Sequence, residues 1–146
     1  MNATAAYRES EVHEADPVHL VVLLYDQLIR DISSAAEAAT RSDVITRTQE
    51  IDHAMAVIAH LQATLNMQQG DVSSDLARFY EVLRAGLLTA QLQASAELLR
   101  KQLTNVMTVR EAWVEVERQW RNAQCASTPN KSYSPDSSVG GGDWKA

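Results

Sequence analysis

Between Pro17 and Pro129 the chain contains no proline and only two glycines, Gly70 and Gly86. Glycine and proline most often mark turns, so a stretch with so few of them permits long helices and disfavours an all-β fold, which needs frequent turns. The 146 residues are enough for one domain of ordinary size. The sequence therefore predicts an all-α chain built from a few long helices.

Apolar residues recur every three to four positions in four successive segments, which is the period of an amphipathic helix. Helix starts are expected at Asp16-Pro17, at Ser42-Asp43, and at Ser73 or Ser74. Gly70 is expected to end the second helix, and a weak turn at 91–95 separates the third from the fourth. Short connections between long helices favour an antiparallel four-helix bundle.

The two ends of the chain differ from the middle in composition. Residues 1–15 are mostly polar, and Tyr7 and Val12 are their main apolar side chains. We expect these residues to form an N-terminal arm. From Asn122 onward Ser, Pro, Gly and Asn dominate, which is typical of a flexible, disordered tail. The predicted layout is an arm at 1–15, a bundle at 16–121 and a tail at 122–146.

The charge balance limits the classes of partner. Thirteen Lys and Arg stand against 19 Asp and Glu, a net charge of −6, and the basic residues are interspersed with acids. Nucleic acids and anionic membranes normally require a basic face, so neither is an expected partner. One cysteine, Cys125, and the lack of a signal peptide or a 20-residue apolar run favour a cytoplasmic location.

Few residues suggest chemistry. Glu50 and His53 form an E-x-x-H pattern, which is half of the signature of ferritin-like di-iron bundles, but no second copy exists and the interior face of the first helix offers Leu, Val and Ala instead of a carboxylate. His53 and His60 lack the basic residue and glycine that usually follow a phosphotransfer histidine, and His13 and His19 are expected on the surface. We expect no catalytic residue, no metal and no cofactor.

The helices carry more apolar residues than one bundle can bury. A bundle helix needs an apolar stripe a little over 100° wide, whereas residues 18–25 are apolar almost all round. Further candidates beside the main stripes are Val57, Leu61, Val82 and Leu88. The surplus predicts a cover supplied by the arm, by a second copy or by a partner chain.

The run from Pro17 to Asp26, an opening proline and aliphatics followed by Leu-Tyr-Asp, resembles the first helix of the flagellin-specific export chaperones. Three other features match the family in order: Tyr7 and Val12 in the arm, the junction Leu65, Gly70, Leu76 and Phe79-Tyr80, and the motif Arg110-Glu111-Ala112-Trp113. The resemblance covers residues 7 to about 117.

The resemblance implies a non-enzymatic cytoplasmic chaperone. Such a protein binds the disordered C-terminal segment of flagellin, prevents its premature polymerisation and presents it to the flagellar type III export gate. The segment is expected to fold into helices in apolar grooves outside the bundle. The expected contact residues are Tyr7, Val12, Leu23, Leu24, Tyr25, Asp26, Ile58, Leu65 and Tyr80.

Alternatives stay open at this point. Tyr25, Ile58, Leu65 and Tyr80 also fit a core, and Asp26 also fits a solvated helix face. We expect Arg110 to pair with a carboxylate on the second or third helix, and Trp113 to cap the core. A ferritin-like metal-binding bundle and a self-associating protein, such as a homodimer, are the competing functions.

Overall fold

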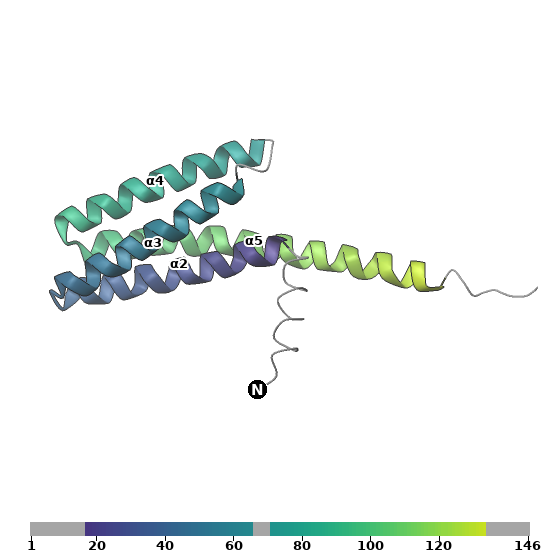
Figure 1. The fold of residues 1–146 in the computed structure, drawn as a ribbon, viewed down its shortest axis with the longest axis horizontal. Helices are drawn as coiled ribbons and strands as arrows, with labels where there is room; N and C mark the ends of the chain where they lie inside the picture. Colours follow the sequence, from purple (N-terminus) through teal and green to yellow (C-terminus); the bar gives the residue numbers. More distant parts are fainter. Residues whose placement is uncertain (1–16, 66–70, 134–146) are drawn as a thin grey trace, which may run out of the picture.

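The computed structural model describes residues 17–65 and 71–133. These form four helices, α2 (Pro17–Thr40), α3 (Val44–Leu65), α4 (Asp71–Gln93) and α5 (Ala96–Tyr133), and no strand occurs among them. Each helix packs against two others, in the ring α2, α3, α4, α5 (Figure 1). The predicted all-α four-helix bundle is confirmed.

The helix starts follow from local capping. Proline at position 17 is the first residue of α2, where its missing N–H costs nothing, while the predicted cap Asp16 lies outside the described residues. Asp43 caps α3, since its Oδ1 accepts a hydrogen bond from the backbone N–H of Thr46 at 3.1 Å. The Ser95 hydroxyl does the same for α5, at 3.0 Å from the N–H of Leu98.

Two predicted boundaries are wrong. Helix α4 begins at Asp71, so Ser73 and Ser74 lie inside its first turn and neither is the cap. Helix α5 does not end before Asn122 but continues to Tyr133, projecting well past the other three helices (Figure 1). Adding residues to an existing helix avoids the cost of nucleation, so a polar segment such as Asn122-Ala123-Gln124 can extend it.

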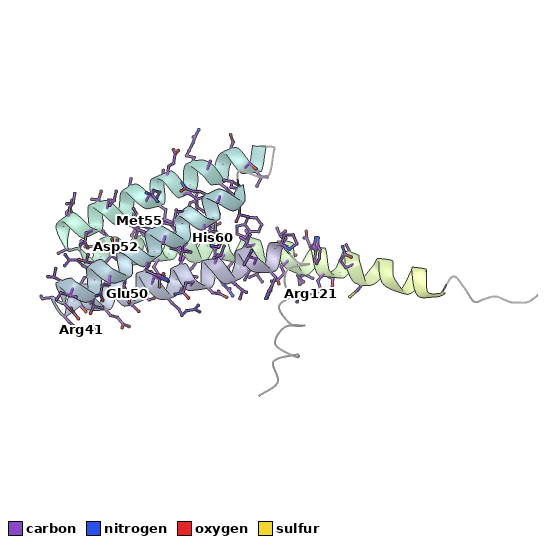
Figure 2. All side chains as sticks on the ribbon, viewed as in Figure 1. Arg41, Glu50, Asp52, Met55, His60 and Arg121 are labelled. Carbon is purple, nitrogen blue, oxygen red and sulfur yellow. The ribbon has the colours of Figure 1, made fainter. Side chains whose placement is uncertain are left out.

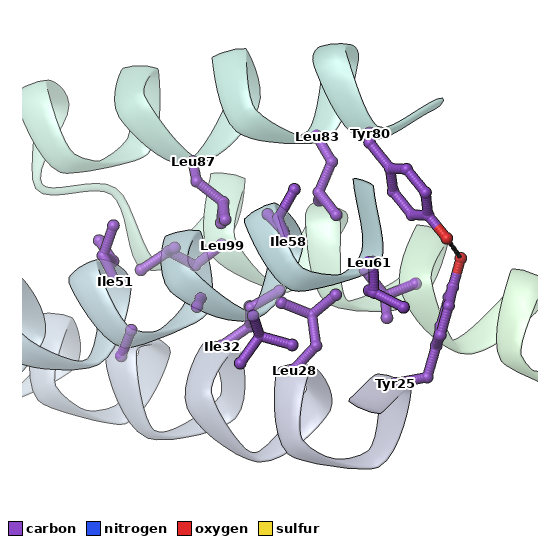
Figure 3. Packing of buried hydrophobic residues seen from close by; sticks show 14 of the residues in the cluster. Tyr25, Leu28, Ile32, Ile51, Ile58, Leu61, Tyr80, Leu83, Leu87 and Leu99 are labelled. Atoms are coloured by element: carbon purple, nitrogen blue, oxygen red, sulfur yellow. Dashed lines mark hydrogen bonds between the residues drawn. The ribbon is translucent and has the colours of Figure 1, made fainter. Parts of the chain in front are cut away.

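The core is a single cluster formed by all four helices (Figure 3). Its largest fully buried side chains are Tyr25, Tyr80, Leu28, Ile32, Ile58, Leu61, Leu83, Leu87, Leu99 and Val106. Val57 and Leu61, which the sequence assigned to surplus surface, are part of this core. Val44 and Met107, by contrast, are exposed.

No helix in the described part of the chain has the length and apolarity needed to cross a membrane.

Candidate functional site

An apolar groove lies between the first half of α4 and the middle of α5. Its volume is about 260 Å³, and its lining residues are Val72, Leu76, Val109, Ala112, Trp113 and Val116. The two helices meet at the short connection that joins them and diverge toward Asp71 (Figure 1). The groove therefore lies where the two helices are farther apart.

Helical spacing explains why these side chains line one groove. On α5 the lining residues fall at intervals of three and four positions, so they form one stripe about 10 Å long. Val72 and Leu76 are one turn apart on α4 and form the opposite wall. Apart from the indole nitrogen of Trp113, the lining side chains are hydrocarbon, so the groove suits an apolar ligand surface and offers no metal ligands.

An aromatic cluster stands beside the groove. The hydroxyls of Tyr25 on α2 and Tyr80 on α4 share a hydrogen bond of 2.9 Å (Figure 3). The ring of Tyr25 also lies 6.5 Å from the ring of Trp113, and Phe79 lies 5.7 Å from Tyr80, both tilted contacts typical of aromatic pairs. Burial raises the pKa of both tyrosines above the usual value near 10, so both hydroxyls stay protonated at physiological pH.

Four of the nine predicted contact residues are core residues in this structure. Tyr25, Ile58, Leu65 and Tyr80 are all buried in the central cluster. They match the alternative that the sequence left open, and a direct contact between them and a ligand would require the bundle to open. Two further predicted residues, Tyr7 and Val12, lie outside the described residues.

The remaining three predicted residues lie on α2. Leu23 is exposed, Leu24 packs against the edge of the core, and Asp26 is half-buried. The Asp26 Oδ1 accepts a hydrogen bond from Arg110 Nε at 2.5 Å. The prediction that Arg110 pairs with the second or third helix is therefore wrong, because its partner is on the first.

Sequence reasoning missed three of the six groove residues. Val72, Val109 and Val116 were not singled out, whereas Leu76, Ala112 and Trp113 were named as family landmarks and not as contact residues. A usable signal was the run Val109, Ala112 or Trp113, and Val116, which places a second apolar stripe on α5 beside its core stripe.

His53, the histidine of the E-x-x-H pattern, is part of a hydrogen-bond network. His53 Nδ1 lies 2.6 Å from Oδ2 of Asp31, and Gln27 Nε2 donates to Oδ1 of Asp31 at 2.8 Å. Asp31 is a buried carboxylate on α2, so the expectation that the inner face of the first helix offers only Leu, Val and Ala is wrong. Among residues 17–65 and 71–133, no three His, Cys, Asp or Glu side chains are grouped so as to hold a metal.

A second polar contact joins α2 to α5 where α5 leaves the bundle. Glu117 is buried, and its Oε2 lies 2.5 Å from His19 Nδ1 and 2.7 Å from Arg121 Nη2 (Figure 2 labels Arg121). His19, expected as an ordinary surface residue, is therefore part of the contact between these helices. The pairs His19–Glu117 and Asp26–Arg110 thus add polar contacts to the packing of α2 on α5, whereas the α4–α5 groove is lined by apolar side chains.

Comparison with known proteins shows the family of the chain. Residues 1–120 match the family model described as "Flagellar protein FliS". The chain is 26% identical over 124 residues to the flagellar secretion chaperone FliS of Bacillus subtilis, covering 83% of this chain and 92% of that protein. It is also 26% identical over 106 residues to the flagellar secretion chaperone FliSB of Pseudomonas aeruginosa, covering 72% of this chain and 84% of that protein. Because the family model spans most of its length, the chain belongs to the FliS family of flagellar proteins.

Proposed function

We propose that this protein is a cytoplasmic flagellar secretion chaperone that binds the disordered C-terminal segment of flagellin. It keeps this client from polymerising early and delivers it to the flagellar export gate. Membership of the FliS family and the names of the two relatives support a non-catalytic role in flagellar export. The single observation that carries the binding role is the apolar groove between α4 and α5.

The shape and chemistry of the groove fit an amphipathic helix. Its α5 wall presents apolar side chains over two helical turns, which matches the spacing of anchors at positions i, i+3 or i+4, and i+7 on a client helix. A disordered client must be ordered on binding, and that entropy cost offsets much of the gain from burying apolar surface. The complex is therefore specific and reversible, as a secretion chaperone requires.

Titration of the full chain with a flagellin C-terminal peptide tests the proposal. We expect a one-to-one complex by calorimetry and a gain of helicity by circular dichroism. Absence of both heat and helicity with the wild-type chain would refute the proposal.

Matched valine substitutions locate the binding surface. Val72 and Val116 line the groove and are 68% and 43% exposed, so Val72→Asp and Val116→Asp leave the core intact. Val82, 61% exposed on the same helix as Val72, does not line the groove and supplies the control Val82→Asp. We expect the two groove variants to weaken binding roughly tenfold or more, since each places a charge in an apolar interface. Equal effects from all three variants would place the client elsewhere.

One observation favours self-association as a second candidate. Gln91 on α4 bonds to Arg47 and Thr48 on α3 at the end of the bundle remote from the groove. Exposed apolar residues lie within about a turn of this contact, namely Val44, Ile45, Leu88 and Leu92. Light scattering over a dilution series, with and without the flagellin peptide, separates a homodimer formed through this surface from client binding. Concentration-dependent mass that Leu92→Asp abolishes would support the dimer.

A further inference from the structure

Tyr25 links the two helices that form the walls of the groove. Its hydroxyl shares a hydrogen bond of 2.9 Å with the hydroxyl of Tyr80 on α4, in which either oxygen can be the donor. Its ring lies 6.5 Å from the ring of Trp113 on α5, in a tilted contact.

These two contacts of Tyr25 reach both walls of the groove. Trp113 lines the groove from α5, and Tyr80 lies one turn beyond Leu76, a lining residue on α4. Tyr25 itself is fully buried and does not line the groove. Its ring therefore packs beside the indole on one wall, and its hydroxyl bonds to the helix that forms the other wall.

Helix α4 needs such a restraint. It packs less extensively against α3 and α5 than α2 does against its own two neighbours. Among the described residues, the polar contacts between α4 and the other helices are at two places, the Tyr80 hydroxyl near the middle of α4 and Gln91 near its C-terminal end. The contact at Gln91 lies beside the α4–α5 connection, where the helices are already close. The Tyr80 bond is therefore the polar contact nearer the diverging end, where it adds to the apolar packing of Leu76 and Phe79.

We infer that Tyr25 is a positioning residue for the groove, which through its bond to Tyr80 limits the separation of α4 from α5 before a client binds. Its effect on affinity rests on the proposed function, whereas its effect on the free protein does not. Preorganised walls lower the entropy cost of binding, so the loss of this hydroxyl reduces affinity without removing any contact with the client.

Tyrosine-to-phenylalanine variants of the full chain test the inference. Tyr25→Phe and Tyr80→Phe each remove the bond between the two hydroxyls while keeping both rings in the core. Tyr133→Phe, at the far end of α5, is the matched control. The readout on the free protein is hydrogen exchange of the backbone amides at 72–80, measured by NMR.

We expect Tyr25→Phe and Tyr80→Phe each to accelerate exchange of the α4 amides roughly tenfold and to weaken flagellin peptide binding by a similar factor. The double variant should have no larger effect than either single variant, because all three lack the same bond, while Tyr133→Phe changes neither property. A folded Tyr25→Phe protein with wild-type exchange, or one with faster exchange and wild-type affinity, overturns the inference. If the wild-type chain binds no peptide, the proposed function fails and the exchange data alone decide whether Tyr25 positions the groove walls.

Discussion

Arg110 on α5 donates a hydrogen bond from Nε to Oδ1 of Asp26 on α2, at 2.5 Å and across 84 positions of sequence. Both side chains are about 30% exposed, so water screens the pair only in part. The same guanidinium also lies 3.6 Å from Glu111 on its own helix. Asp26 is therefore engaged in holding two helices together, and this is the structural alternative to its predicted role as a client contact.

Breaking this pair should cost little stability. We expect Asp26→Ala and Arg110→Ala each to lower the free energy of unfolding by up to about 1 kcal/mol, since partly exposed ion pairs are rarely worth more. A double-mutant cycle by urea denaturation measures the coupling. If Asp26 acts through Arg110, both variants change peptide affinity equally. A loss of affinity in Asp26→Ala alone would instead support a direct contact between Asp26 and the client.

Replacing Gly86 with alanine should stabilise the protein. Glycine inside a helix costs up to about 1 kcal/mol relative to alanine. A Cβ at position 86 would meet Gln102 Nε2 at 2.5 Å and Cδ at 2.6 Å, but these atoms are the flexible end of a half-buried side chain that can move aside. We expect Gly86→Ala to raise the melting temperature by about 1–3 °C. A lower melting temperature would show that Gln102 is held in place, and Gly86→Ala combined with Gln102→Ala checks that reading.

Removing His53 should lower the free energy of unfolding, because the buried Asp31 carboxylate loses one of its two side-chain partners. In His53→Ala the carboxylate keeps Gln27 as its remaining hydrogen-bond donor, and an under-satisfied buried group costs about 1–3 kcal/mol. His60→Ala is the matched control on the exposed face of α3, where we expect a change within about 0.5 kcal/mol. Chemical denaturation measures both, and equal losses would contradict a special role for His53.

The cap at Asp43 predicts that the stability of the protein depends on pH. The hydrogen bond from the Thr46 backbone lowers the pKa of Asp43, with smaller contributions from the Thr46 side chain and Arg41. The carboxyl of the unfolded chain titrates near pH 4, so the stabilisation is complete above that value and is lost as the pH falls through the lower pKa of the folded state.

The variant Asp43→Asn serves as the reference, because an asparagine side chain still caps a helix but does not titrate. We expect the difference in melting temperature between the wild-type chain and Asp43→Asn to change steadily, in favour of the variant, as the pH falls from about 5 to 2. A constant difference over this range would show that the Asp43 carboxylate does not support the cap.

The sequence predicted the helices better than the site. Pro17, Asp43 and the scarcity of glycine and proline placed three of the four helices within a few residues, because capping and periodicity are local properties. The same local reasoning ended the fourth helix at Asn122 when it continues to Tyr133, since composition measures preference and not the continuation of an existing helix.

The sequence by itself determined an all-α bundle with more apolar surface than its core can hold, because that follows from counting apolar faces on each helix. Only the tertiary structure decided which apolar residues are left over. Val57, Leu61, Tyr25 and Tyr80 became core, whereas Val109 and Val116 became a groove wall. Which apolar residues line the groove depends on the angle between α4 and α5. Contacts between helices that are distant in sequence set this angle, and no single helix sets it alone.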